Sequence, residues 1–395
     1  MTQPVFRVRP GGPNNGPSHE VVGRGDEAEP AVRAFLLDLL AGDRSPATVK
    51  TYALALCSWL NFLGSQGIGW QEATPSHLRD FVLHLRTADN PHRARRKPGG
   101  PLPGSTNVRT GKPYLAAGYK AATINARLSV IQGFHAFQEQ ATGLGTAGGL
   151  LSGVRRRHPH HNPLEPWTGQ RRGRFRQRQP RRLPRALGDD LWGELFESVE
   201  HDRDRAILCL FVSSAARAQE LLDMRGRDVD WAGQRVCLTC KGTRHRTWVA
   251  ASPEFFRWLA SYLVRRGPVA PDAPLWVTLR APARLLGYTA LRAIFTRANE
   301  RLGTNITAHD LRHTCALRLA VDPAVPLVHI QSHLRHQNIG TTQLYLTART
   351  DEVVANVHAH LSRKPSGTPA ADQHAGWAYD PADLRALLGP DEAPP

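Results

Sequence analysis

Apolar residues recur at helical spacing in the first part of the chain. Val32, Phe35, Leu36 and Leu39 stand at positions i, i+3, i+4 and i+7 before Gly42, which predicts an amphipathic helix. Similar patterns predict three further helices at about 47–64, 77–86 and 121–141. The spacing therefore predicts a small all-α domain of four helices at about 29–145.

Punctuating residues define the borders of these helices. Ser45 directly before Pro46 is typical of an N-cap followed by proline at the first helical position. The stretch 87–118 is rich in Pro, Gly and basic residues and predicts a loop. Residues 1–28 hold many Gly, Pro and Asn residues and few large apolar ones, which predicts a disordered N-terminal tail.

The second half mixes two periodicities. Helical patterns cover about 189–224, 253–267, 288–303 and 311–361. Between them, 228–252 has short alternating apolar runs broken at Gly233 and Gly242, which predicts two or three strands joined by tight turns. We therefore expect a basic interdomain linker at 146–182, a domain at 183–363 and a C-terminal tail at 364–395. In that tail, 382–389 predicts one short helix or a disordered segment.

The charge is large and concentrated. Among 395 residues, Lys and Arg number 51 and Asp and Glu number 34, giving +17 and an isoelectric point near 10.5. Residues 86–120 and 155–185 together carry this whole excess. Such clustering favours a polyanion-binding surface, which indicates nucleic acid. No apolar run is long enough for a membrane span, and five scattered cysteines do not form a disulfide framework, so we expect a cytoplasmic protein.

Four short segments of the second half hold polar residues where apolar residues would pack better. Taken singly, each has an ordinary structural explanation: a surface arginine, turn chemistry, or a core tyrosine. The His-x-x-Arg pair at 309–312 places both side chains on one helical face. The candidate residues are Arg217, Lys241, His309, Arg312, His336 and Tyr345.

In this order, the set resembles the catalytic signature of tyrosine recombinases, the phage-integrase-like family. Segment 216–231 resembles its first arginine box, 240–250 its Lys-Gly-x-x-x-Arg hairpin, and 308–316 its His-x-Leu-Arg-His-Thr box. Segment 333–345 resembles the Leu-Gly-His-x8-Tyr box, with Arg335 where glycine is usual. The motifs at 45–52 and 122–128 resemble the family's core-binding domain.

The resemblance covers about 29–363 and implies a fold. It implies a mainly α protein with a small antiparallel β-sheet in two domains. The first is an all-α, four-helix, SAM-like core-binding domain, and the second is an α+β catalytic domain. A type IB topoisomerase-like enzyme and a catalytically degenerate DNA-binding protein are the alternatives, and Arg335 gives weight to the second. A bulky side chain there would shift His336 or add a phosphate contact.

The resemblance also implies a chemistry. Tyr345 would attack the scissile phosphate, leaving a 3′-phosphotyrosine and a free 5′-hydroxyl, while Arg217 and Arg312 bind the phosphoryl oxygens. Lys241 would be the general acid. His309 would hold the phosphate or accept the tyrosine proton, and His336 would donate to a non-bridging oxygen. Five groups around one phosphate would do the work that a metal does in other nucleases, so we expect no metal. The chain lacks an ATP-binding P-loop motif, so we expect no ATP use and no other cofactor.

The expected partners are double-stranded DNA at recombination sites and three further copies of the chain, as a tetramer on two sites, with accessory DNA-bending proteins an option. The basic side chains expected to contact DNA are Arg93, Arg95, Arg96, Lys97, Arg155, Arg156, Arg157, Arg171, Arg172 and Arg174. Two smaller features remain. Glu220 supports Arg217 or pairs with the helix dipole, and Cys237 with Cys240 do not form a zinc site because they point to opposite faces of a strand.

Overall fold

The computed structural model describes residues 5–12, 16–90, 100–142, 175–179, 185–240, 245–322 and 324–335. The chain divides into two compact units, Met1–Arg182 and Leu183–Pro395. Among the described residues, no helix is both long enough and apolar enough to cross a membrane. Each unit is described by itself below.

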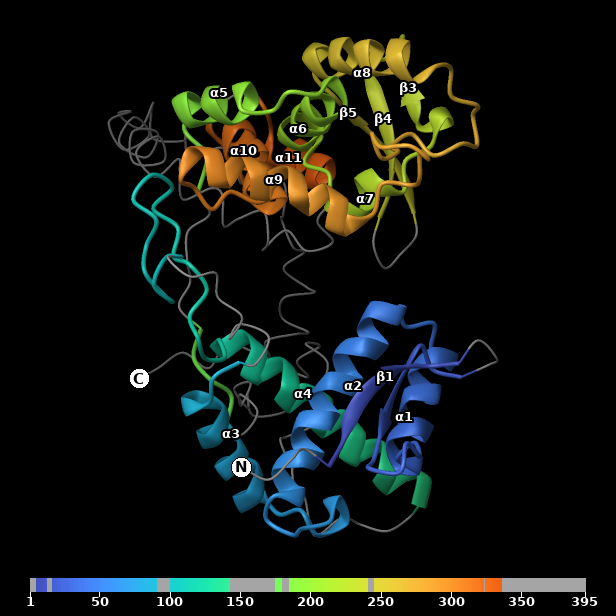
Figure 1. Ribbon diagram of the computed structural model, residues 1–395, viewed down its shortest axis with the longest axis vertical. Coiled ribbons are helices and arrows are strands. Elements are labelled where there is room, and N and C mark those ends of the chain that lie inside the picture. The colour runs from blue at the N-terminus through green and yellow to red at the C-terminus, as the bar shows by residue number, and fades with distance from the viewer. Residues whose placement is uncertain are drawn as a thin grey trace, which may run out of the picture. The chain divides into compact units, whose positions relative to one another are not determined.

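The first unit is helical, as its apolar spacing predicts. Its elements are α1 (Pro30–Ala41), α2 (Pro46–Gly64), the 3-10 turn η1 (Trp70–Glu72), α3 (Pro75–Thr87) and α4 (Ala121–Thr142). Helix α2 contacts α1, α3 and α4, and Figure 1 shows α4 crossing beside it. The predicted cap is confirmed, because the Ser45 hydroxyl accepts the Thr48 N–H at 3.3 Å.

The N-terminal tail was predicted wrongly. Residues Arg7–Pro10 (β1) and His19–Val22 (β2) form an antiparallel hairpin that contacts α2. Val21 and Val22 are buried, and the Asn61 side chain bonds both the N–H and the carbonyl of Phe6 at 2.9 Å. Burial of these valines compensates the ordering of a segment whose glycine and proline content suggested disorder.

The core of this unit includes one titratable side chain. His135 on α4 is 2% exposed and lies against the fully buried Trp59 of α2. The Trp59 indole Nε1–H donates to His135 Nε2 at 3.3 Å. An indole nitrogen only donates, so Nε2 carries the lone pair and Nδ1 the hydrogen. Among the described residues, no partner reaches that Nδ1.

The connections of the first unit follow the predictions in part. Residues 100–120 form a loop with bridges at Thr106–Pro113 and Asp89–Gly118 and no helix or longer strand among its described residues. Within the predicted linker, 175–179 lie on α4, where Asn125 and Gln177 exchange two hydrogen bonds of 2.8 and 2.9 Å. The rest of 146–182 and the tail 364–395 lie outside the described residues.

The second unit combines helices with one small sheet. Before the sheet come α5 (Asp189–Glu197), α6 (Asp202–Ser214), α7 (Ala218–Leu222) and η3 (Gly226–Asp228). The antiparallel sheet has the order β3 (Val229–Asp230), β4 (Arg235–Thr239), β5 (Arg246–Ala250). The helices α8 (Pro253–Arg266), α9 (Tyr288–Leu302), α10 (Ala308–Val321) and α11 (Leu327–Leu334) follow.

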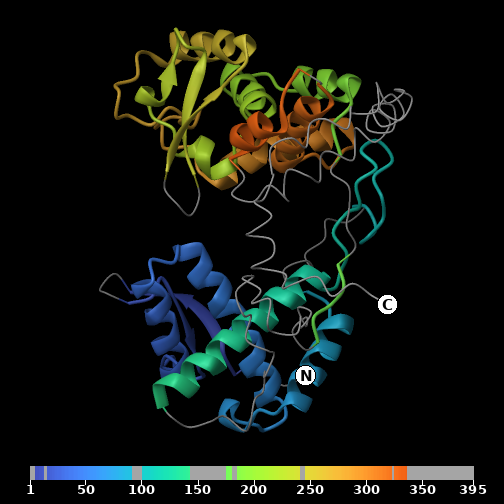
Figure 2. The same ribbon diagram turned by 180° about the vertical axis from the view of Figure 1, so that it is seen from behind.

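Helix α6 lies at the centre of this unit and contacts α8, α10 and β5 (Figures 1 and 2). Its apolar residues are buried around the helix, as the continuous apolar run of the sequence indicated. The helix ends at Ser214, and Ala215 adopts a left-handed conformation with φ 50°. This residue turns the chain so that α7 begins directly after Arg217.

Candidate active site

The described residues include three of the six predicted catalytic side chains. Arg217, His309 and Arg312 are described, and all three lie in the second unit. Lys241, His336 and Tyr345 lie outside the described residues. So do all the basic side chains predicted to contact DNA, from Arg93 to Arg174.

Arg217 is the N-cap residue of α7 and is paired with Glu220. Its Nη1 donates to Glu220 Oε1 at 2.6 Å, and its backbone N–H donates to Oε2 at 2.9 Å. The Glu220 side chain is 1% exposed and that of Arg217 35%. Glu220 therefore supports Arg217 and also caps the helix, so both of its predicted roles are present.

The charge of Glu220 depends on its arginine partners. Burial alone would raise the pKa of this carboxyl group. The positive charge of Arg335 and the hydrogen bonds from Arg217 outweigh burial, so that the pKa lies below its ordinary value. Glu220 is therefore an ionised carboxylate at neutral pH.

Arg312 is buried in α10 and reaches backward to the end of α6. Its Nη1 donates to the Ala215 carbonyl, and its Nη2 donates to the Leu334 carbonyl at 2.5 Å. Only 4% of the residue is exposed. Two backbone carbonyls from different segments thus hold one guanidinium, which fixes its direction.

Arg335 follows α11 and adopts a left-handed conformation, with φ 53° and ψ 45°. Glycine adopts this conformation most readily, which explains why the related motif usually has glycine here. The Arg335 side chain is 2% exposed, and its Nη2 donates to Glu220 Oε2 at 3.0 Å. In this structure the guanidinium is therefore held by protein acceptors, Glu220 and the backbone carbonyls of the preceding segments. His336, whose position Arg335 was expected to affect, lies outside the described residues.

The segment Ser213–Arg217, here called the α6–α7 junction, accepts hydrogen bonds from two other helices and from Arg335. Ser213 O accepts from His333 Nε2 at 2.8 Å and from the Cys315 thiol at 3.3 Å. Ser214 O accepts from Arg335 at 3.2 Å, and Ala215 O accepts from both Arg335 and Arg312.

His333 was missed by the sequence analysis. Its partner is a carbonyl, so Nε2 carries the hydrogen, and burial holds the pKa of the imidazole below its ordinary value. The only signal in the sequence is its place three residues before His336, and that spacing does not identify Ser213 as its partner.

His309 lies in the first turn of α10, one helical turn before Arg312, and is exposed. Its ring contacts that of His313 edge to face, with centroids 4.3 Å apart. Asp310 caps the same helix, because its carboxylate accepts the Thr307 N–H at 2.8 Å. Asp310 therefore has a structural role at the start of this helix.

The hairpin predicted to carry Lys241 is formed by β4 and β5. The Cys240 N–H donates to the His245 carbonyl at 2.8 Å and closes the ladder just before 241–244, which lie outside the described residues. Cys237 is buried and Cys240 half-buried. Within the described ranges, no group of three His, Cys, Asp or Glu side chains could hold a metal ion.

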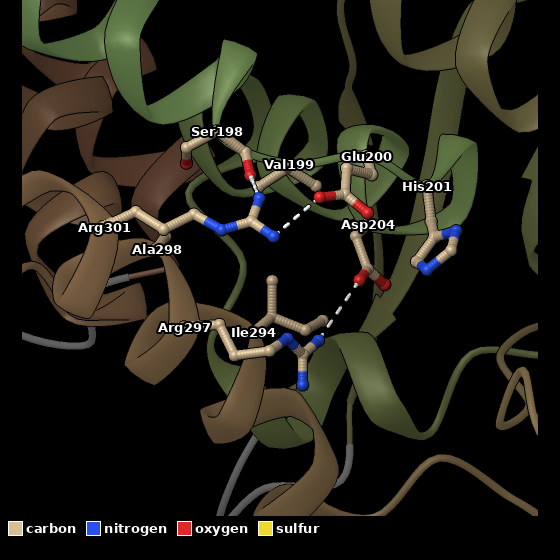
Figure 3. Close-up of a pocket in the computed structure, with 9 residues that line it drawn as sticks. All are labelled: Ser198, Val199, Glu200, His201, Asp204, Ile294, Arg297, Ala298 and Arg301. Carbon is tan, nitrogen blue, oxygen red and sulfur yellow. Dashed lines mark hydrogen bonds and ion pairs between the residues drawn. The ribbon is translucent and has the colours of Figure 1, made fainter.

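A pocket lies elsewhere in this unit, between the α5–α6 connection and α9 (Figure 3). Its charged side chains pair with one another: Arg301 donates to the Ser198 carbonyl at 2.7 Å and to Glu200 at 2.6 Å, and Arg297 lies 3.8 Å from Asp204. Of the three described candidate residues, Arg217, His309 and Arg312, none lines it. The pocket is therefore separate from the described part of the candidate site.

Two family models match the chain. The phage integrase family matches 191–352, and the phage integrase N-terminal SAM-like domain matches 32–97. Together they match more than half of the 395 residues.

Similar proteins agree with this assignment. Tyrosine recombinase XerC of Vibrio vulnificus strain YJ016 is 28% identical over 237 residues, which are 58% of this chain and 67% of that protein. Tyrosine recombinase XerC of Pseudomonas fluorescens strain Pf-5 is 34% identical over 199 residues, covering 47% and 65%.

Two solved structures share the fold. The recombinase XerH bound to palindromic difH substrate is 17% identical, covers 85% of this chain and 86% of that chain, and has a TM-score of 0.52. The Tn1549 transposon integrase in complex with transposon right end DNA is 11% identical, covers 84% and 99%, and has a TM-score of 0.53.

The mainly helical architecture, the small antiparallel sheet and the N-terminal SAM-like domain confirm the expected fold class. The family match and the relatives named tyrosine recombinase disfavour the alternative of a protein without enzymatic function. The chain belongs to the phage integrase family and is a tyrosine-type site-specific recombinase, an enzyme that cleaves and rejoins DNA.

Proposed function

We propose that this recombinase breaks and rejoins DNA through a covalent 3′-phosphotyrosyl intermediate on Tyr345, without metal or ATP. The observation that carries the proposal is the joint anchoring of Arg217 and Arg312. Arg217 belongs to the α6–α7 junction, and Arg312 donates to the Ala215 carbonyl two residues earlier. Because Arg217 is part of this segment and Arg312 is hydrogen-bonded to it, we infer that both guanidiniums are preorganised to bind the oxygens of one phosphate.

In the proposed reaction, the Tyr345 hydroxyl loses its proton and attacks the scissile phosphorus. The bond to the 5′-oxygen breaks as the bond to the tyrosine oxygen forms. Lys241 protonates the leaving 5′-oxygen, while His309 holds the phosphate or accepts the tyrosine proton and His336 donates to a non-bridging oxygen. Attack of a 5′-hydroxyl on the phosphotyrosine reverses these steps, and the phosphotyrosyl bond conserves the energy for resealing.

The proposed partner is duplex DNA, because the Tn1549 integrase named above is in complex with transposon right end DNA and the recombinase XerH is bound to its difH substrate. We assign 29–145 to a core-binding domain, 183–363 to the catalytic domain, and the basic stretches near 93–97 and 155–174 to phosphate contacts. Each neutralised phosphate steepens the salt dependence by about 0.9 of log–log slope. We further propose a tetramer on two sites, acting in the cytoplasm.

Covalent trapping tests the proposed nucleophile. The protein is incubated with nicked duplexes from DNA flanking its gene, so that the cleaved fragment diffuses away, and the products are separated on a denaturing gel. We expect a protein–DNA adduct that Tyr345→Phe abolishes. Tyr288→Phe is the matched control, since Tyr288 is 60% exposed on α9, and it should retain the adduct.

Two outcomes contradict the proposal. No adduct on any duplex that the protein binds tightly excludes the covalent step, and an adduct retained by Tyr345→Phe excludes this tyrosine. Relaxation of a supercoiled plasmid that lacks a recombination site, without strand exchange between two sites, indicates the topoisomerase-like alternative.

A further inference from the structure

Arg335 combines two features that are unfavourable by themselves. Its backbone is left-handed, which a residue with a side chain adopts at a cost. Its guanidinium is buried, and among the described residues no acceptor reaches its Nε. Burial of a charge without compensation is expensive, so the contacts that this side chain does make must offset both costs.

These contacts reach the groups that hold Arg217 and Arg312, the two arginines proposed to bind the scissile phosphate. Arg335 Nη2 lies 3.0 Å from Glu220 Oε2 and 2.9 Å from the Ala215 carbonyl oxygen. The same Glu220 carboxylate pairs with Arg217, and the same carbonyl accepts from Arg312. The buried guanidinium of Arg335 therefore contacts one group that holds Arg217 and one group that holds Arg312.

Because Arg217 and Arg335 share the Glu220 carboxylate, the local charge also changes. A lone Glu220 carboxylate would neutralise Arg217, with which it forms a 2.6 Å ion pair. With Arg335 on the other carboxylate oxygen, one negative charge is divided between two positive ones. The group of Arg217, Glu220 and Arg335 keeps a net charge of +1, so Arg217 retains attraction for an anionic phosphate.

We propose that Arg335 is a positioning residue for cleavage, which fixes Glu220 and the Ala215 carbonyl and thereby sets the placement and charge of Arg217 and Arg312. The proposal rests on the proposed function of these two arginines. It assigns Arg335 no contact with DNA.

Adduct formation on nicked duplex tests the proposal when DNA binding is measured separately. Arg335→Gly removes the guanidinium and suits the left-handed backbone, so the fold is expected to remain. We expect its affinity for DNA to stay within about twofold of wild type, while the rate of adduct formation at saturating protein falls at least tenfold. Arg335→Lys keeps the charge but loses the planar guanidinium, so its rate of adduct formation should lie between those of wild type and Arg335→Gly.

A substrate with a neutral methylphosphonate at the scissile position separates positioning from general stability. If Arg335 acts through the charge and placement of Arg217 and Arg312, the ratio of the adduct-formation rates of wild type and Arg335→Gly should shrink toward one on this substrate. An equal loss on both substrates, or a wild-type rate for Arg335→Gly on ordinary DNA, overturns the proposal.

Two controls keep the outcomes distinct. If the wild-type chain forms no adduct on either substrate, the proposed function has failed and not only the role of Arg335. If circular dichroism shows that Arg335→Gly does not fold, Glu220→Gln replaces it, because this variant keeps the size of the side chain while it removes the shared charge and one of the two acceptor oxygens. A wild-type rate for Glu220→Gln on ordinary DNA then overturns the proposal.

Discussion

Acid should destabilise the first unit through a single buried histidine. Protonation of His135 at Nε2 would break the hydrogen bond from Trp59 and place a positive charge among aromatic rings. Burial lowers the pKa of His135 from an ordinary 6.5 to about 4. The folded unit therefore keeps His135 neutral through a pH range in which the unfolded chain binds a proton.

The sign and size follow from proton linkage. Between pH 6.5 and about 4, the unfolded state binds up to one more proton at this site, so the free energy of unfolding falls as the pH falls. At about 1.4 kcal/mol for each pKa unit, the loss amounts to roughly 3 kcal/mol by pH 4. Above pH 6.5 the site contributes no pH dependence.

Hydrogen exchange read by mass spectrometry measures this unit separately from the other. Peptides from α2 and α4 of the full chain are followed at several values between pH 7 and pH 4.5, with correction for the intrinsic pH dependence of exchange. His135→Gln keeps an acceptor for Trp59 but does not titrate, so its stability should fall less with acid. His84→Gln, at an exposed position on α3, is the matched control.

The reasoning is refuted if His135→Gln loses protection as steeply as wild type between pH 6.5 and 4.5. It is also refuted if His84→Gln flattens the profile to the same extent. In either case, other groups would account for the acid sensitivity of the unit.

Further predictions concern individual residues of both units. Ser45→Ala should destabilise the first unit by about 1 kcal/mol through loss of its cap, measured by hydrogen exchange in α2. Gly226→Ala would place a Cβ 2.6 Å from a backbone oxygen and should cost about 1–3 kcal/mol in thermal unfolding. Gly188→Ala, with open space around it, should change stability by less than about 0.5 kcal/mol. Burial raises the pKa of Cys209 and Cys315 to about 12, so iodoacetamide at pH 8 should leave both unlabelled in the folded protein, and labelling of either would contradict this.

The sequence predicts helices well where the signals are local. Gly42 and the Ser45–Pro46 pair mark the end of one helix and the start of the next, because capping depends on residues within one turn. The β1–β2 hairpin was missed because its strands have four residues each and glycine and proline lie between them. The burial of Val21 and Val22 depends on helices that follow later in the chain.

In the candidate site, too, features set by neighbouring residues were predictable and contacts between distant residues were not. The spacing of His309 and Arg312 predicts their common helix, which α10 confirms. The role of Arg335 could not be predicted, because its partner Glu220 lies 115 residues earlier in the chain. A local pattern identifies Arg335 only as a departure from glycine, whereas its contacts with Glu220 and the Ala215 carbonyl, on which the proposed role rests, appear only in the folded chain.

The end of α6 affects how DNA binding and cleavage should each respond to ionic strength. A helix C-terminus carries the equivalent of about half a negative charge, which would repel an approaching phosphodiester. Here Arg312 and Arg335 cover the last carbonyls from the protein interior. Mobile ions screen exposed charges far more than buried ones. Added salt should therefore release the enzyme from DNA at concentrations that leave the cleavage rate of the bound complex nearly unchanged.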